Sequence, residues 1–192
     1  DDFFPVWTRG SGSCPGCASL PNRPGREARE YRSRLYWTDR LRVVVTISEA
    51  LFATRHLVLE PIQNRHFCNL LRLQGDRRVM RHIPGGTRSR EQVASAIERY
   101  TMHWSKFGHG MWSVFCGKSV RFLGIAGLQR AEEFDGVHVA MLLFQEPREF
   151  DVALEAFCAA AIFGFEHLDV QEVFALTRSR NSAALKLLER TP

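Results

Sequence analysis

The sequence predicts an α+β domain in which a mixed, mostly antiparallel sheet is flanked by helices. Three strand-like runs, at residues 111–116, 122–128 and 137–144, follow one another with short turns between them. Segments with helical spacing of apolar residues precede and follow these runs. An antiparallel meander that leads into a crossover helix is typical of α+β folds.

The elements before the meander are marked by apolar spacing and by residues that break helices. The apolar run at 57–59, directly before Pro61, predicts a short strand. Residues 65–73 have apolar side chains at helical spacing until Gly75 interrupts the pattern. A Pro-Gly-Gly turn at 84–86 then separates this predicted helix from the next one.

The remaining elements follow from one helix-start pattern and three periodic segments. Ser89 followed three residues later by Gln92 is a helix-start pattern. The apolar face of that helix repeats every three or four residues: Val93, Ile97, Tyr100 and Trp104. Beyond the meander we expect an apolar helix at 153–168, a short strand at 173–176 and an amphipathic helix at 181–190.

Residues 1–45 differ in composition from the rest of the chain. Residues 8–29 are rich in Gly, Pro, Ser and Arg and show no apolar period, which is typical of loops and disordered segments. The run Val43-Val44-Val45 is strand-like but isolated. We therefore expect a poorly ordered N-terminal extension over 1–45 and one folded domain over 46–192.

Composition limits the partners of this protein. The 192 residues have a formal net charge of +5, and the basic side chains are interspersed with acidic ones, which argues against a nucleic-acid partner. No apolar run reaches the roughly 20 residues of a membrane span, so we expect a cytoplasmic protein without membrane attachment. Among the five cysteines, Cys14 and Cys17 have zinc or redox spacing, but no second pair follows them and no metal site is expected.

Six short segments, taken in order, resemble the GNAT N-acetyltransferases. Within that family, they look most similar to the branch of the ribosomal-protein N-terminal alanine acetyltransferases. The resemblance extends from about Thr46 to Arg190 with nearly family-like spacing. The six segments are ATRHLVLEP at 53–61, IPGG at 83–86, GMWSV at 110–114, FLGIAGL at 122–128, ALT at 175–177 and NSAA at 181–184.

The resemblance implies an enzyme that transfers an acetyl group from acetyl-CoA to an amine, either a peptide N-terminus or a small molecule. Direct transfer within a ternary complex needs a base for the ammonium, a donor to the oxyanion and an acid for the departing thiolate. In the family, a backbone N–H of the fourth strand serves the oxyanion. That position corresponds to Leu142, Leu143 and Phe144 in this chain.

The phosphate-binding loop departs from the family pattern. Members usually open the crossover helix with Gly-x-Gly-x-Ala, whose backbone N–H groups approach the pyrophosphate of coenzyme A. The corresponding residues here are Glu149, Phe150, Asp151, Val152 and Ala153, so acids replace both glycines. Asp151 is also a natural helix N-cap that would occupy the same N–H groups. We therefore expect acetyl-CoA binding to be weakened by this degenerate loop.

The resemblance also indicates residues for proton transfer and coenzyme contact. His138 stands where the fourth strand often has a glutamate, and it is the candidate base. Ser182, near the start of the last helix, is the candidate acid, because Ala184 occupies the usual serine position. Asn181 matches an asparagine that contacts the coenzyme in the family. The alternatives are an exposed strand histidine for His138, a helix-start residue for Ser182 and a plain N-cap for Asn181. His109 is a second candidate, for the acceptor pocket.

The sequence stops at Thr191-Pro192, where family members continue with one or two further strands. We therefore expect the C-terminal strands of the sheet to be missing and the strand at 173–176 to have an unpaired edge. Three arrangements are open: the chain is a truncated fragment, a second copy pairs with the edge in a homodimer, or residues 43–46 cover it.

Two functional hypotheses remain at this stage. The first is an acetyl-CoA-dependent N-acetyltransferase, which the breadth of the resemblance favours. The alternative is a catalytically inactive domain of the same fold that serves binding or interaction, or a truncated fragment, which the loss of the loop glycines favours.

Overall fold

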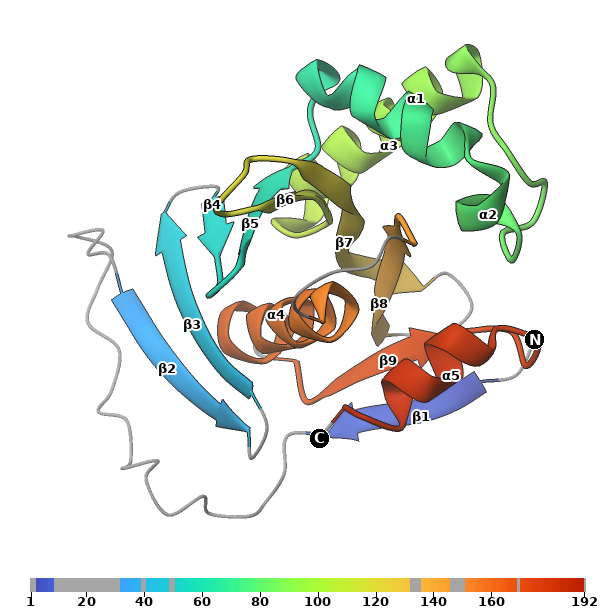
Figure 1. Cartoon of the computed structure of the whole chain (residues 1–192). Helices are drawn as coiled ribbons and strands as arrows, with labels where there is room; N and C mark the ends of the chain where they lie inside the picture. Colours follow the sequence, from blue (N-terminus) through green and yellow to red (C-terminus); the bar gives the residue numbers. More distant parts are fainter. Residues whose placement is uncertain are drawn as a thin grey trace.

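The computed structural model describes residues 3–8, 32–38, 41–48, 51–131, 136–145, 151–168 and 170–191. Within these ranges it has a sheet of nine strands with helices on both faces, so the expected α+β class is confirmed (Figure 1). The strands are β1 Phe3–Thr8, β2 Arg32–Thr38, β3 Leu41–Ser48, β4 Leu51–Ala53, β5 Leu57–Pro61, β6 Met111–Cys116, β7 Phe122–Ala131, β8 Gly136–Leu143 and β9 Glu172–Leu176. The helices are η1 Asn64–His66, α1 Phe67–Gly75, α2 Arg77–Met80, α3 Arg90–Phe107, α4 Val152–His167 and α5 Ser182–Leu188.

The sheet follows the order β1-β9-β8-β7-β6-β5-β4-β3-β2. Each neighbouring pair is antiparallel except β8 and β9, which run parallel. The crossover helix α4 connects these two strands, as a parallel pair requires. The predicted meander of β6, β7 and β8 is confirmed, although β7 extends to Ala131.

Helix α3 begins and ends at residues with specific capping geometry. The Ser89 hydroxyl accepts a hydrogen bond from the backbone N–H of Gln92, and the Gln92 side chain accepts one from the backbone N–H of Ser89. Gly108 ends the helix in the left-handed conformation, with φ of 69°. The predicted helix start at Ser89 is therefore confirmed.

Two apolar layers cover the two faces of the sheet. Helix α4 lies across one face, where it contacts β3, β5, β7, β8 and β9 (Figure 1). It is apolar on nearly all sides, because most of its residues between Val152 and Ala161 are buried. The other face is covered by α1 and α3, whose buried side chains pack with those of β6 and β7. No helix among the described residues has the length and apolar character needed to cross a membrane.

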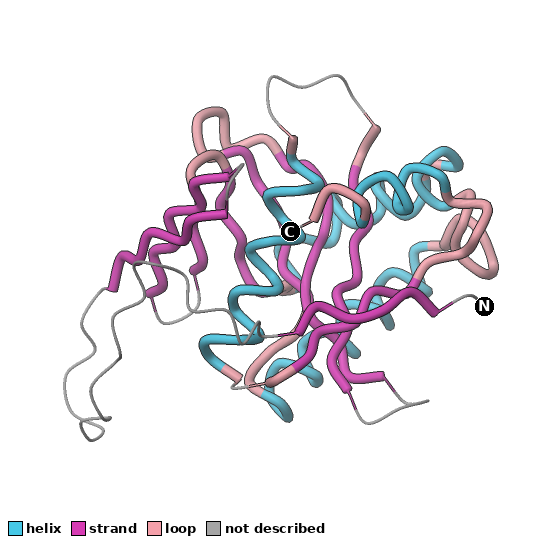
Figure 2. Tube along the Cα trace, turned by 90° about the horizontal axis from the view of Figure 1, so that it is seen from below, coloured by secondary structure: helices cyan, strands magenta, loops and turns pink. Residues whose placement is uncertain are grey.

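The N-terminal region contributes strands to both ends of the sheet. β2 and most of β3 come from residues 1–45, and they extend the sheet beyond β4. β1 lies at the opposite end, antiparallel to β9 (Figures 1 and 2). These three strands therefore belong to the sheet, where the sequence predicted a poorly ordered extension. Residues 9–31, which include Cys14 and Cys17, lie outside the described residues.

The predicted free edge of β9 is occupied by β1. Phe3 pairs with Leu176, and Thr8 pairs with Glu172. The hypothesis that residues 43–46 cover this edge is wrong, because they pair with β2, and Thr46 also pairs with β4. The homodimer proposed through the β9 edge loses its basis for the same reason.

Candidate active site

The parallel strands β8 and β9 pair over a short stretch and then separate. Their register includes only Val137–Val139 against Val173–Ala175, although β8 continues to Leu143. Gly124 of β7 allows the end of β8 to lie close to β7. Its φ is +148°, and a Cβ at this position would come within 2.2 Å of the Leu142 carbonyl oxygen. The separation opens the sheet between β8 and β9.

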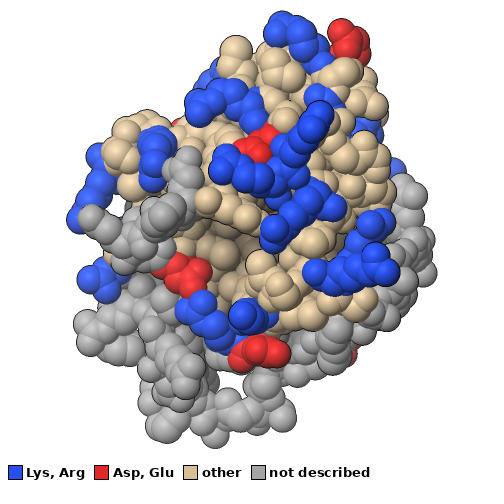
Figure 3. All heavy atoms as spheres, turned by 45° about the vertical axis from the view of Figure 1, so that its right-hand side comes forward, with Lys and Arg blue, Asp and Glu red and all other residues tan. Residues whose placement is uncertain are grey.

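Two cavities, of about 620 and 380 Å³, lie at this opening. The larger is lined by the end of β8, the first turns of α4 and α5, and residues that follow α2. The smaller is lined by β8, the end of β9, α5 and the turn after α2. Six residues line both: His82, Ile83, Met141, Asn181, Ala184 and Leu187. The two spaces therefore adjoin, and Figure 3 shows a hollow on the face between α2 and α5.

Most of the predicted coenzyme residues come together in the larger cavity. Leu142 and Leu143 line it from the end of β8, and Phe144 from the residue that follows. Asp151, Val152 and Ala153 line it from the N-cap and first turn of α4, and Asn181 from the N-cap of α5. Glu149 and Phe150 lie outside the described residues.

The backbone at the end of β8 presents unpaired polar groups to this cavity. The N–H of Phe144 donates to the carbonyl of Leu123 on β7, at 3.0 Å. Because successive residues of an antiparallel strand point their N–H groups to opposite sides, those of Met141 and Leu143 face away from β7. β9 is no longer paired with β8 at these positions. The N–H groups of Met141 and Leu143 are therefore the backbone donors at the opening.

The start of α4 is closed by an acidic cap. The carboxylate of Asp151 accepts a hydrogen bond from the N–H of Leu154 at 3.0 Å, as the sequence predicted for an N-cap. Its other oxygen forms an ion pair with Arg190 at 2.5 Å. The side chains of Asp151 and Arg190 are 31% and 53% exposed, so the pair lies at the cavity surface.

The start of α5 contributes Asn181 but not Ser182. The side-chain oxygen of Asn181 accepts a hydrogen bond from the N–H of Ala184 at 3.3 Å, and Asn181 lines both cavities. Ser182 is exposed and lines neither cavity. Asn181 therefore serves as an N-cap and also faces the opening.

His138 and His109 lie away from the opening. His138 is located where β8 is still paired with β9, opposite Phe174, and it lines neither cavity. Burial, followed by the nearby His103, holds the pKa of His138 below its ordinary value. His109 is buried, and burial is also the main reason for its lowered pKa. The structure does not bring these two histidines to the cavities.

Sequence reasoning missed His82, which lines both cavities from the turn that follows α2. Its side chain is half-buried. The available signal was its position directly before the Ile83-Pro84-Gly85-Gly86 turn, but the elements that complete the cavities follow much later in the sequence.

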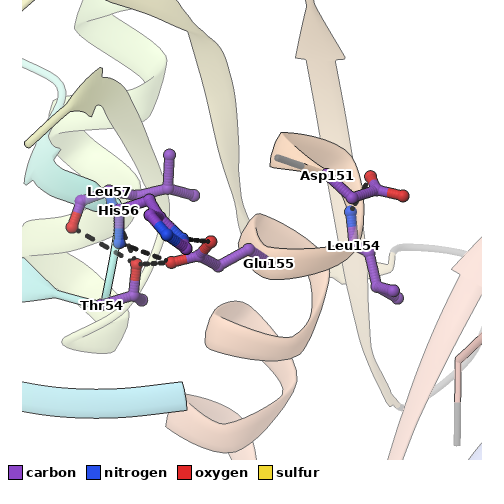
Figure 4. Close-up of polar contacts among 6 residues, drawn as sticks. All are labelled: Thr54, His56, Leu57, Asp151, Leu154 and Glu155. Atoms are coloured by element: carbon purple, nitrogen blue, oxygen red, sulfur yellow. Dashed lines mark hydrogen bonds and ion pairs between the residues drawn. The ribbon is translucent and has the colours of Figure 1, made fainter. Parts of the chain in front are cut away.

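A buried carboxylate of α4 forms hydrogen bonds with the segment between β4 and β5 (Figure 4). Glu155, only 4% exposed, accepts hydrogen bonds from the hydroxyl of Thr54, the backbone N–H of His56 and the imidazole Nδ1 of His56. The three distances are 2.5, 2.9 and 2.8 Å. The residues between β4 and β5 thereby set the position of the helix whose first turn lines the larger cavity.

In Figure 3, Lys and Arg side chains border much of the hollow, an acidic group lies at one edge, and the floor is mostly uncharged. Two segments that border the cavities supply exposed basic residues: Arg77, Arg78, Arg81, Arg178, Arg180, Lys186 and Arg190. Such a rim favours the approach of anionic ligands. Among the described residues, no group of three or more His, Cys, Asp and Glu side chains is arranged to hold a metal ion.

Comparison with known proteins identifies the family. The acetyltransferase (GNAT) domain matches residues 56–191. The chain belongs to this family. Its fold is similar to an acetyltransferase of Agrobacterium tumefaciens, with a TM-score of 0.65 and 21% identity over 83% of this chain and 86% of the other. A GnaT-family acetyltransferase of Bordetella pertussis gives 0.64 and 21%, over 74% and 87%.

A third GNAT neighbour was solved with ligands. The spermidine N-acetyltransferase of Vibrio cholerae, in complex with CoA and spermine, has a TM-score of 0.57 and 16% identity over 69% of this chain and 78% of the other. At these identities the likeness concerns the fold, and the acceptor of this GNAT chain has to be argued from its own cavities.

Proposed function

We propose that this protein transfers an acetyl group from acetyl-CoA to an amine in the opening between β8 and β9. The observation that carries the proposal is the cavity of about 620 Å³, lined by the backbone at the end of β8 and by the first turns of α4 and α5. A GNAT acetyltransferase needs backbone N–H donors on a strand that is not paired at the site of acetyl transfer. The separation of β8 from β9 supplies such donors.

The residues fit the thioester end of acetyl-CoA. The N–H groups of Met141 and Leu143 face the opening, where one of them can donate to the thioester oxygen as negative charge develops on it. The apolar side chains of Val152, Ala153 and Leu187 provide a surface for the pantetheine chain. Asn181 adds a side-chain amide at the same edge.

The residues at the phosphate end of the site are unfavourable for an anion. Asp151 occupies the helix N-terminus that would otherwise receive the pyrophosphate, and its charge repels an anion. Arg190 partly neutralises this charge through the ion pair. The capping of α4 by Asp151 supports the alternative function, in which a GNAT domain has kept its fold as a binding module and lost acetyl transfer.

For the acceptor we propose a peptide N-terminus, in line with the resemblance to the ribosomal-protein branch, rather than a polyamine. A polyamine carries several positive charges and needs carboxylates around it. The described lining of the smaller cavity includes no Asp or Glu, and it includes Arg178. A single amino group on an otherwise uncharged chain is compatible with this lining.

The first test is the thermal midpoint with and without millimolar acetyl-CoA, for the native chain and for Glu149→Gly/Asp151→Gly. Ligand at about 100 times its dissociation constant stabilises the folded state by roughly 2.7 kcal/mol. For a chain of this size that raises the midpoint by about 5–10 °C. A shift in the native chain supports the acetyltransferase. A shift that appears only in the double variant supports a closed coenzyme site.

A further inference from the structure

We propose that His82 is the residue that accepts the proton from the acceptor amine. The inference rests on the proposed function, since it assigns a role within that reaction. It starts from the six residues that line both cavities, where the thioester and the amine have to meet. Among them His82 is the only imidazole, the side chain that most often serves as a general base.

The charged groups around His82 do not compete for this role. Asp151 lines the larger cavity, but its carboxylate caps α4 and pairs with Arg190. Arg178 lines the smaller cavity, and a guanidinium stays protonated. Arg81 precedes His82 at the end of α2 and is exposed. Each of these groups is therefore either engaged or unable to accept a proton.

The position of His82 also suits the direction of the reaction. It approaches the opening from the turn after α2, opposite the first turn of α5, and both cavities include residues from these two elements. An amine in the smaller cavity would have both His82 and Met141 in its walls, because both residues also line the larger cavity. His138, by contrast, lies where β8 and β9 are still paired.

The step balances as follows. The ammonium of the acceptor loses one proton to a nitrogen of His82, and the lone pair that this leaves forms the new N–C bond. The C–S bond of the thioester breaks, and its electron pair goes to sulfur. The second proton lost by nitrogen goes to the thiolate, and His82 releases its proton to solvent. The products are the amide, the free thiol of CoA and one proton.

The test uses the full chain with acetyl-CoA and three amine probes: an alanine-initiated peptide, a serine-initiated peptide and spermidine. Acetylated product is measured by mass spectrometry from pH 5.5 to 9, and acetyl-CoA binding is measured by thermal shift. We expect His82→Gln to lower kcat by about 100-fold or more and to remove the acid limb of the pH profile, with the thermal shift unchanged. His82→Glu should restore part of the rate and move the acid limb to lower pH.

Two further histidine variants make the result specific. His167→Gln changes an exposed residue at the far end of α4, lining neither cavity, and should keep the native rate and profile. A native profile in His82→Gln, or loss of the acid limb in His138→Gln instead, overturns the role of His82 while acetyl transfer itself stands. Native chain that yields no product from any of the three probes overturns acetyl transfer, and the role of His82 with it.

Discussion

Two carboxylates, one on the N-cap of α4 and one four residues later within the helix, have opposite surroundings (Figure 4). Glu155 is buried and accepts hydrogen bonds from Thr54 and His56, which hold the helix against the sheet. Asp151 is partly exposed, caps the helix and lies in the wall of the larger cavity. The comparison indicates that α4 is anchored at its second turn so that its first turn can remain accessible.

The difference also separates stability from binding. A buried carboxylate loses much of its hydration, so its partners become indispensable to the fold. A partly exposed carboxylate contributes little to stability but changes the electrostatic potential that a ligand meets. Substitutions at the two positions should therefore affect different measurements.

The largest effect is expected for Glu155→Ala. The substitution leaves the Thr54 hydroxyl and two N–H groups of His56 without their acceptor and creates a cavity, which should cost about 3 kcal/mol of unfolding free energy. Urea denaturation followed by circular dichroism measures this loss. Glu98→Gln, at an exposed position of α3, is the matched control and should change stability by less than about 0.5 kcal/mol. Equal stability of the two variants would show that the network is not an anchor.

The histidines should show the same division between stability and chemistry. Burial lowers the pKa of His109 and His138 in the folded state, so the unfolded chain binds more protons below about pH 6.5. Stability should therefore be fully present above that pH and decrease as the pH falls, by up to about 1.4 kcal/mol per pH unit for each histidine. Urea midpoints at pH 7.5 and 5.5 measure this dependence. His138→Gln should make it shallower, whereas an unchanged slope would exclude His138 as a contributor.

A smaller effect, on binding rather than stability, is expected for Asp151→Asn. The amide oxygen can still cap α4, but the negative charge next to the coenzyme site is removed. Acetyl-CoA should bind about three- to tenfold more tightly, with the unfolding free energy changed by less than about 1 kcal/mol. Isothermal titration calorimetry measures the affinity. Weaker binding would mean that Asp151 contributes to the ligand site rather than opposing it.

The smallest effect is expected for Arg190→Gln, which removes the counterion of Asp151. Because the pair is half-exposed, its loss should change stability by less than about 1 kcal/mol. Acetyl-CoA affinity should fall by about two- to threefold, since the uncompensated carboxylate repels the phosphates more strongly. In the Asp151→Asn background, Arg190→Gln should change acetyl-CoA affinity by a different factor than it does in the native chain. Strictly additive changes in binding free energy would indicate that the two side chains act independently.

Local patterns were sufficient for much of the fold. The capping residues of α3 and the apolar runs of β6 and β8 are short-range signals, and these elements lie where they were expected. β1 was missed because its partner, β9, lies near the other end of the sequence. β2 pairs with the neighbouring strand β3, but its own residues show no clear alternation of apolar and polar side chains. Helix α2 is only four residues long, too short for an apolar period.

The site could be predicted where it depends on one continuous segment, and not where it depends on packing. The segments at 142–144 and 151–153 and Asn181 were identified from their motif positions and do meet in one cavity. The orientation of the Met141 and Leu143 N–H groups depends on the register with β7, which one sequence does not determine. His82 approaches from an element that no motif connected with β8.

The pairing of β1 with β9 makes the order of synthesis relevant to folding. β1 is formed by some of the first residues of the chain, and its partner follows only after nearly the whole sequence, at Glu172–Leu176. A contact between such distant residues closes a very long loop, which slows its formation. During synthesis, β1 emerges well before its partner strand β9. The part of the sheet next to the cavities should therefore be completed late in folding.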